Sequence, residues 1–430
     1  MLIKNSIKNP YYWGTIDIVL EQLSQIILFV FLSRNLNEEI FGLFAVLQTI
    51  TFIALLIMDS GLGSGVISFQ ITDRRKLNQI FTFNLLISIS IVLILVLFRG
   101  FIINWFNIAG YERVYFFTVV FLVIEAFSLI QYSQLKRDLR FGRMAFITLV
   151  SIIVTFSSII PAVKMISGEY VLLLRLVVPK TVRTIGYFIS TGYRPSFDFN
   201  IKSLGVELRY GLGVMYMSIL NWFNQSIMVF YIGGKAGPGT LGYYNRAYGL
   251  QKIASKTVST VLNRIGFSVM SSVKGNDSEV LNNYINSRIF LMLGGIFLAL
   301  PVQWYSETLV TLVIGDKWHL TAIFLKFLIP ISLISQFYDL NVTVNKAYNK
   351  LKYALWIDSI EKISFVLLLV ILRNRSIEEI LFGLGVLRLS TLLISDLQVS
   401  RVLGHFPKVI NLLIYILIFT GFFQLIQMQF

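Results

Sequence analysis

Residues 79–103, QIFTFNLLISISIVLILVLFRGFII, decide the fold class of this protein. No charged side chain occurs in this stretch before Arg99, and its few polar residues are hydroxyls and amides. A helix rises about 1.5 Å per residue, so about 20 such residues cross the roughly 30 Å hydrocarbon core of a bilayer. The stretch therefore predicts a transmembrane helix.

The composition of the whole chain agrees with that prediction. Of its 430 residues, 56% are hydrophobic and 14% charged, and the mean hydropathy is +0.74, whereas soluble domains carry about 25% charged residues. The net charge of +15 comes with no basic run longer than three residues, which argues against a nucleic-acid partner. The lack of cysteine excludes disulfides and thiolate metal sites. An integral membrane protein is expected.

Apolar stretches of similar length recur along the chain. In the segments between them, Lys and Arg number sixteen on the side of the N-terminus and eight on the other, so the N-terminus is expected in the cytoplasm. Trp318 is interpreted as one of the interface anchors. The longest connection, residues 191–205, is too short for a soluble catalytic domain. We predict thirteen spans, over residues 14–33, 41–69, 79–103, 114–133, 144–162, 170–190, 206–232, 241–272, 284–305, 319–346, 353–372, 378–400 and 409–427.

Two short internal echoes indicate a duplicated chain. Residues 40–44 (IFGLF) open the second span and residues 240–244 (TLGYY) open the eighth, at an offset of 200. Residues 143–145 (RMA) and 352–354 (KYA) open the fifth and eleventh, at an offset of 209. Both pairs lie six spans apart, so the two copies share one orientation in the membrane. We predict a six-helix lobe over 1–192, a cytoplasmic linker over 193–205, a second six-helix lobe over 206–400 and an extra helix over 409–427.

Three segments resemble motifs of bacterial polysaccharide exporters. Residues 36–44 (LNEEIFGLF) with 59–64 (DSGLGS) look like their second-helix pattern, residues 242–248 (GYYNRAY) their G-Y-Y-x-x-A-Y segment, and residues 314–318 (IGDKW) their G-x-x-W loop. From residue 10 to about 400, the chain resembles the Wzx-type O-antigen and exopolysaccharide flippases of the multidrug/oligosaccharidyl-lipid/polysaccharide exporter superfamily. The resemblance implies an all-α membrane protein of twelve core helices, in two six-helix lobes around a central cavity, with variable extra C-terminal helices.

Polar side chains follow one face of the eighth span and one face of the seventh. A charge at mid-bilayer costs roughly 2.5–3.5 kcal/mol on insertion scales, so we predict that these residues line a hydrated cavity. Cations there would bind phosphate oxygens, and amides or hydroxyls would bind sugars. The predicted substrate-binding cations are Lys252, Lys256, Arg246, Arg264 and Lys180, and the predicted polar lining is Asn245, Ser259, Asn263, Ser218, Asn221, Asn224 and Gln225.

Alternative interpretations stay open for each of these cations. Arg246 and Arg264 lie near opposite membrane surfaces, where long basic side chains can snorkel towards the headgroups. Lys252 and Lys256 also fit local pairing with carboxylates, and so does Lys180, which follows a proline near mid-span. Pairing would make these lysines structural instead of substrate-binding.

Other polar features of the spans receive structural interpretations. Arg175 and Arg183 are expected to snorkel from helix ends, and Asp358 is expected to pair with Lys362 four residues later. The glycine cluster at 61–65 lacks the spacing of a phosphate-binding loop. It fits close helix packing, with a break that lets the second span bend.

Directional transport needs an energy source, and a carboxylate inside the membrane that exchanges H⁺ or Na⁺ is a usual device. Asp17 and Glu21 lie four residues apart on the first span, and Ser24 and Gln25 continue their face. No metal or organic cofactor is expected, and an H⁺ or Na⁺ gradient is the candidate energy source. The ion-coupling candidates are Asp17, Glu21, Glu125 and Asp339.

The resemblance implies a carrier and not an enzyme: a flippase for undecaprenyl-diphosphate-linked oligosaccharide repeat units, in the bacterial inner membrane. Its expected partners are that lipid, other membrane lipids, a polysaccharide polymerase and a chain-length regulator. One alternative is a membrane polysaccharide polymerase or ligase, which typically carries a large periplasmic loop. Another is a multidrug/cation antiporter of the same fold, which needs a cavity dominated by carboxylates and aromatics. Short outside loops and the basic eighth span favour the flippase.

Overall fold

The computed structural model describes residues 10–272, 277–348 and 350–404, and the side chains of 256–272 fall outside that description. Regular structure over the described residues consists of helices, with no strand. The chain divides into two compact units, unit 1 (Met1–Gly242) and unit 2 (Tyr243–Phe430). The predicted all-α membrane fold class is confirmed.

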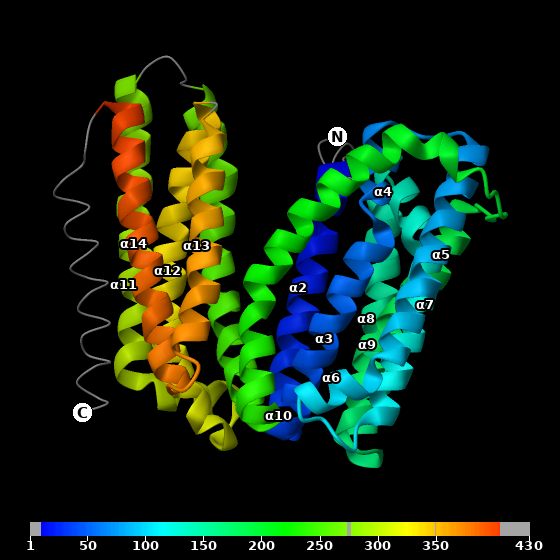
Figure 1. The fold of residues 1–430 in the computed structure, drawn as a ribbon, viewed down its shortest axis with the longest axis horizontal. Helices are drawn as coiled ribbons and strands as arrows, with labels where there is room; N and C mark the ends of the chain where they lie inside the picture. The colour runs from blue at the N-terminus through cyan, green and yellow to red at the C-terminus, as the bar shows by residue number, and fades with distance from the viewer. Residues whose placement is uncertain (1–9, 273–276, 349, 405–430) are drawn as a thin grey trace, which may run out of the picture. The chain divides into compact units, whose positions relative to one another are not determined.

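Unit 1 is built from long apolar helices joined by short turns (Figure 1). Asp73 is the N-cap of the helix at Arg74–Leu97, and its side chain accepts a hydrogen bond from the backbone N–H of Arg75 at 3.0 Å. The helices are α2 (Pro10–Asn35), α3 (Glu38–Asp59), α4 (Leu62–Ser68), α5 (Arg74–Leu97), α6 (Arg99–Trp105), α7 (Glu112–Arg137), α8 (Phe141–Met165) and α9 (Gly168–Thr191), and the first part of α10 (Gly205–Ser272) completes the unit.

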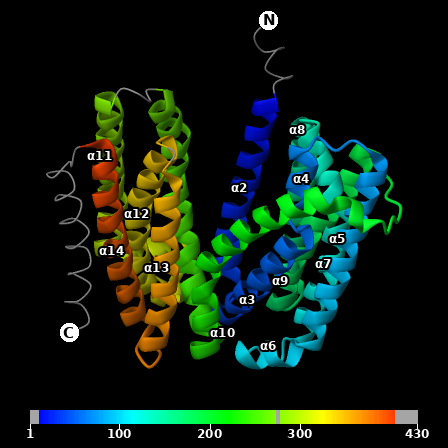
Figure 2. The same cartoon turned by 45° about the horizontal axis from the view of Figure 1, so that its top comes forward.

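The long helices of unit 1 pack into a bundle. In Figure 2, α2 lies against α8, α8 against α9, α9 against α7 and α7 against α5, while α3 contacts α5, α7 and α9. Ala54, Met58 and Leu122 form a buried apolar cluster between α3 and α7. Phe146 and Ile189 are apolar and exposed, as expected for side chains that face lipid.

The predicted second span is broken between α3 and α4. Ser60 and Gly61 take left-handed backbone angles, with φ of 48° and 67°. A Cβ on Gly61 would lie 2.2 Å from the carbonyl oxygen of Gly211, so glycine is required by packing as well as by φ. The expected bend and close packing are confirmed at Gly61. Gly65 has open space around it, so the packing interpretation is wrong there.

The predicted seventh and eighth spans both fall within α10, which consists of two helices that meet at a kink. Gly237 interrupts it with φ of 75° and ψ of −178°, and Pro238 follows without an N–H to donate. Before this break, α10 packs along unit 1, where the indole N–H of Trp222 donates to the carbonyl of Thr49 at 3.2 Å. The boundary between the two compact units falls after Gly242, within α10.

The linker predicted at 193–205 is held against the start of α5. The Tyr193 hydroxyl donates to Asn78 Oδ1 at 2.6 Å, and the backbone N–H of Asp198 donates to Thr82 Oγ1 at 2.9 Å. The backbone N–H of Asn200 donates to the Asp198 carboxylate and holds the pKa of Asp198 below its ordinary value. The segment is therefore an ordered strap on unit 1.

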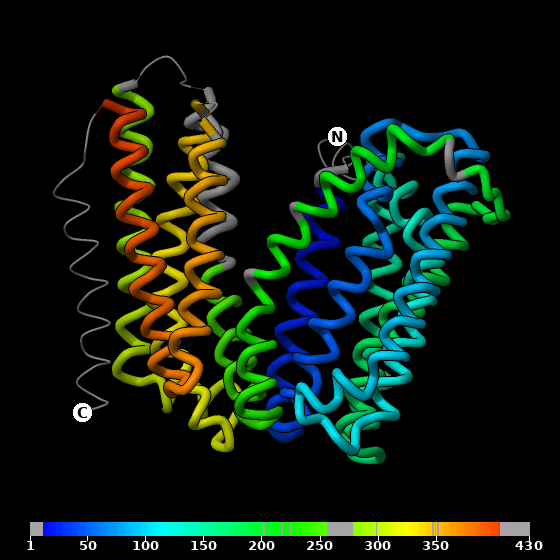
Figure 3. The backbone as a smooth tube through the Cα atoms, in the orientation of Figure 1, coloured from blue at the N-terminus to red at the C-terminus, as the bar shows by residue number. Residues whose placement is uncertain are grey.

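Unit 2 contains α11 (Asp277–Ile314), α12 (His319–Ala347), α13 (Leu351–Ile371) and α14 (Ile377–Leu403), which run alongside one another in Figure 3. Two of the quoted motifs meet here: the Tyr243 ring stands edge-on to Trp318, with ring centroids 5.8 Å apart. Trp318 is fully buried, so its prediction as an interface anchor is wrong. Trp318 is buried because it packs against Tyr243 of the other motif.

Eight helices among the described residues are long and apolar enough to cross a membrane. The remaining predicted spans within the described residues are also helical. The span predicted at 409–427 lies outside the described residues. The chain is a multi-pass membrane protein.

Two glycines of unit 1 that correspond under the predicted duplication make equivalent close contacts. A Cβ on Gly42 would lie 1.8 Å from the carbonyl oxygen of Pro238, and a Cβ on Gly242 would lie 1.9 Å from that of Glu38. Under the 200-residue offset, Gly42 corresponds to Gly242 and Glu38 to Pro238. Each glycine thus packs against the residue that corresponds to the partner of the other glycine. Such reciprocal contacts indicate a local two-fold relation. This packing supports the internal duplication.

Candidate functional site

Unit 1 contains a cavity of about 520 Å³ among α2, α3, α7, α8 and α9. Ligand pockets in proteins commonly measure about 300–1,000 Å³. Five charged residues line it, namely Glu21, Glu125, Arg175, Lys180 and Arg183. The uncharged polar lining consists of Ser24, Gln25, Gln48, Ser128, Tyr132, Ser151, Thr155 and Tyr187. Such a lining, inside a bundle of membrane helices, suits a polar and charged ligand.

All three cations of the cavity come from α9. Arg175, Pro179 and Arg183 follow at four-residue spacing, which keeps them near one face of the helix, and Lys180 lies beside them. Pro179 has no N–H, so it cannot donate to the carbonyl of Arg175 four residues earlier. The carbonyl of Pro179 accepts a hydrogen bond from the Ser151 hydroxyl of α8 at 3.2 Å. This contact fixes the charged stretch of α9 against its neighbour.

Two of these cations meet carboxylates from other helices. The Lys180 ammonium donates to Glu125 of α7, and Arg183 Nη1 donates to Glu21 of α2 at 3.0 Å. The side chains of the first pair are 29% and 26% exposed, and those of the second 26% and 39%. Both pairs are therefore open to a ligand in the cavity.

Arg175 has no such carboxylate. Its guanidinium lies over the Phe44 ring, with 4.8 Å between Cζ and the ring centroid. Among the described residues it forms no ion pair, and its Nη1 is buried with no hydrogen-bond partner. Arg175 therefore contributes to the cavity lining a positive charge that no carboxylate among the described residues compensates.

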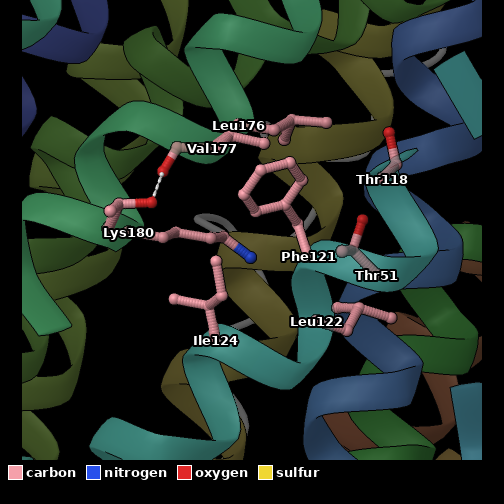
Figure 4. A pocket seen from close by; sticks show the side chains of 9 residues that line it. Thr51, Thr118, Phe121, Leu122, Ile124, Leu176, Val177 and Lys180 are labelled. Carbon is pink, nitrogen blue, oxygen red and sulfur yellow. Dashed lines mark hydrogen bonds between the residues drawn. The ribbon is translucent and has the colours of Figure 1, made fainter.

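Lys180 lies at the boundary with a second, smaller pocket. Figure 4 shows its side chain extending from α9 towards Phe121 and Ile124 of α7. The walls of this pocket are mostly apolar, and Lys180 and Leu176 line both spaces. Its ammonium therefore reaches the edge of the polar cavity, where Glu125 is its counter-charge.

The predicted substrate-binding cations lie in different places. Lys180 lines the cavity of unit 1. Arg246 is buried in unit 2, with 3% of its surface exposed, and Lys252 is exposed on α10. The side chains of Lys256 and Arg264 lie outside the described residues.

The predicted polar lining is likewise divided between the units. Ser218, Asn221 and Gln225 belong to unit 1 and do not line its cavity, and the Ser218 hydroxyl donates to the carbonyl of Val214 at 2.9 Å. Asn245 is half-buried in unit 2. The side chains of Asn224, Ser259 and Asn263 lie outside the described residues. A cavity lined by both stripes stays a prediction.

The predicted acids are found in three settings. Glu21 and Glu125 line the cavity, where both pair with cations. Asp17 lies one turn before Glu21, with its Oδ1 buried and without a hydrogen-bond partner among the described residues, and it is close enough to Arg183 to interact electrostatically. Asp339 is exposed on α12 of unit 2. No cluster of three metal-ligating side chains occurs in the described part of the chain.

The prediction that Arg175 and Arg183 snorkel is wrong, because both line the cavity. A polar cavity gives a long basic side chain a nearer polar environment than the membrane surface does. Sequence spacing places these residues on one face of a helix, but it does not show what that face contacts. The signal that would identify the site is the three cations on α9 together with Glu21 and Glu125 on apolar spans.

Unit 2 holds a polar cluster that the sequence analysis does not predict. Arg288 of α11 donates two hydrogen bonds to Asp396 of α14, at 2.7 and 3.0 Å, and both side chains are fully buried. Asn341 of α12 also donates to Asp396, at 2.6 Å. The partners Arg288 and Asp396 are 108 residues apart, so no local pattern reveals them.

The predicted pair of Asp358 with Lys362 is confirmed.

Two curated proteins resemble this chain over most of its length. The teichuronic acid biosynthesis protein TuaB of Bacillus subtilis (strain 168) is 22% identical over 363 residues, which cover 83% of this chain and 74% of TuaB. The lipopolysaccharide biosynthesis protein WzxC of Escherichia coli (strain K12) is 23% identical over 311 residues, 70% of this chain and 62% of WzxC. The chain thus spans less than two thirds of the length of WzxC.

Solved structures share the fold. The lipid II flippase MurJ, in an inward closed conformation, superposes with a TM-score of 0.73 at 15% identity and 96% coverage of both chains. An inward-facing MATE family multidrug resistance transporter of the MOP superfamily superposes with a TM-score of 0.65 at 12% identity, over 90% of this chain and 98% of that one. Residues 31–323 match the model of the family described as polysaccharide biosynthesis protein. Because this match covers more than half of its residues, the chain belongs to the polysaccharide biosynthesis protein family.

Proposed function

We propose that this protein is a flippase. It would carry an undecaprenyl-diphosphate-linked oligosaccharide repeat unit from the cytoplasmic to the outer leaflet, for O-antigen, capsule or exopolysaccharide assembly. The observation that carries the proposal is the cavity of unit 1, where α9 places three basic side chains in a polar space. The names of two relatives support it, since TuaB is a teichuronic acid biosynthesis protein and WzxC is a lipopolysaccharide biosynthesis protein.

The chemistry of such a headgroup matches the cavity. Its diphosphate is anionic and its sugars carry hydroxyls, so the barrier to crossing the bilayer is the loss of water around these groups. Basic side chains replace that water at the phosphates through charge-assisted hydrogen bonds, and serine, threonine and amide groups replace it at the sugars. The lipid tail stays in the bilayer. Alternating access of the cavity to the two leaflets would complete the transfer.

The proposal includes an orientation, an energy source and partners. The excess of Lys and Arg on one side favours an inner-membrane protein with a cytoplasmic N-terminus. An H⁺ or Na⁺ gradient drives the cycle through one of the predicted acids. Asp17 suits this role best, since its Oδ1 is buried without a hydrogen-bond partner in the described part of the chain, whereas Glu21 and Glu125 already pair with cations. A polysaccharide polymerase and a chain-length regulator act on the delivered unit.

A deletion strain tests the proposal. It is complemented with the wild type, with Arg175→Gln, and with Arg99→Gln as a control at an exposed position outside the cavity. Surface polysaccharide is measured, and lipid-linked oligosaccharides are labelled with a membrane-impermeant reagent. Loss of a charged hydrogen bond costs roughly 1.5–3 kcal/mol, so we expect export by Arg175→Gln to fall by about tenfold or more.

The location of the trapped lipid decides the class of protein. Without the flippase, single repeat units remain in the cytoplasmic leaflet, shielded from the reagent. Accumulation of single units in the outer leaflet would contradict the proposal, because translocation would be intact. A polymerase or ligase would then replace the flippase.

A further inference from the structure

The carboxylates of the cavity carry an inference that rests on the proposed function and concerns its regulation. Glu125 of α7 and Glu21 of α2 approach α9 from two different helices, and each pairs with one cation. Arg175, the third cation, has no carboxylate among the described residues. The lining therefore holds three positive and two negative side chains, with Asp17 near Arg183 as a further acid.

An empty carrier must keep these cations inside the membrane. A basic side chain there is expensive unless a counter-charge accompanies it, and removing one partner of such a pair leaves the other uncompensated. A ligand would provide that counter-charge only while bound. Glu21 and Glu125 supply it in the empty cavity, so two of the three cations are neutralised without any ligand.

A carboxylate and a phosphate compete for the same donors. Both present oxygens to the N–H groups of lysine and arginine with similar geometry and charge. The partners of both ion pairs are roughly a quarter to two fifths exposed, so a headgroup in the cavity can reach them. Arg175 lines the cavity without a carboxylate partner among the described residues, so its charge attracts a phosphate with no carboxylate to displace.

We propose that Glu21 and Glu125 are place-holding anions. They occupy Arg183 and Lys180 while the cavity is empty, and the diphosphate displaces them after its first contact with Arg175. When the headgroup leaves, the carboxylates pair with Arg183 and Lys180 again. Release therefore does not leave three cations in the membrane without counter-charges. The two glutamates thus weaken binding and speed release.

Amide substitution separates this role from direct contact with the ligand. Glu125→Gln and Glu21→Gln keep the shape of the side chain and remove the competing charge. We expect each variant to bind undecaprenyl diphosphate about two- to fivefold more tightly, the range that follows from a partly exposed ion pair. Polysaccharide export should nevertheless fall, because release becomes slower. Glu307→Gln, at an exposed position on α11 outside the cavity, is the matched control.

Binding is measured on the purified full chain in detergent, with undecaprenyl diphosphate as the probe, and monodisperse elution checks the fold of each variant. Lys180→Gln and Arg175→Gln accompany the glutamate variants. If these two weaken binding while both glutamate variants bind equally or more weakly than the wild type, the place-holding role is overturned and the flippase proposal stands. If Arg175→Gln and Lys180→Gln bind like the wild type, the cavity does not hold the diphosphate and both proposals fall.

Discussion

Arg288 and Asp396 are fully buried, whereas the ion pairs of the unit 1 cavity are partly exposed. The buried pair makes two parallel hydrogen bonds, and the Tyr284 hydroxyl accepts a third from Arg288 at 2.6 Å. Asn341 donates to the same carboxylate. No ligand reaches such a pair, so we interpret it as a clamp that joins α11, α12 and α14. Exposure separates this structural pair from the exchangeable ones.

Single and double substitutions test the clamp. Arg288→Met leaves the Asp396 charge buried without a partner, which we expect to destabilise the protein by about 3–5 kcal/mol. The double variant Arg288→Met/Asp396→Leu removes both charges and should recover most of that loss. Thermal unfolding of the purified protein in detergent measures the effect. Arg375→Met, which removes an exposed partner of Glu379, is the control, with an expected change below about 1 kcal/mol. A double variant as unstable as the single one would contradict this interpretation.

At the scale of elements, close backbone contacts decide how helices meet. Gly42 lies at the start of α3 against the carbonyl of Pro238, and Gly242 of α10 lies against the carbonyl of Glu38. A side chain at either position would overlap backbone atoms, which cannot rotate away. These glycines therefore set the distance between the two helix starts.

Alanine scanning of glycines tests this packing. Gly42→Ala and Gly242→Ala place a Cβ within 2 Å of a carbonyl oxygen, so the helices must separate, at an expected cost of about 1–3 kcal/mol. Gly65→Ala in α4 meets no atom within 4 Å and should leave stability unchanged or slightly higher. The melting temperature in detergent and the expression level report the difference. Equal behaviour of the three variants would refute the packing argument.

At the scale of the whole molecule, the distribution of positive charge predicts the orientation in the membrane. The strap at 193–205 and the connection between α13 and α14 should lie on opposite sides, the strap in the cytoplasm. The absence of cysteine from the sequence makes this testable without background labelling.

Labelling of single cysteines introduced at exposed positions measures this orientation. A membrane-impermeant maleimide should label Asn374→Cys in intact cells, and it should label Asn200→Cys only after permeabilisation. Both side chains are exposed, so protection by folding does not confuse the result. Labelling of Asn200→Cys alone in intact cells would invert the assigned orientation.

The sequence by itself determined the membrane class and the helical nature of the spans, while the duplication stays a prediction. These follow from local physics: a backbone in hydrocarbon must satisfy its hydrogen bonds within each helix, so an apolar stretch of about 20 residues is sufficient evidence. The pair of Asp358 with Lys362 was predictable for the same reason, since its partners lie one turn apart.

Only the tertiary structure decided which polar groups meet. Arg183 finds Glu21 at a separation of 162 residues and Lys180 finds Glu125 at 55, while Trp318 is buried against Tyr243 instead of lying at the interface. Periodicity assigns a residue to a face of its helix, but the neighbour of that face depends on how the helices pack. Packing places the cavity of unit 1 beside α9, whereas the cavity predicted along the polar stripes of α10 stays a prediction.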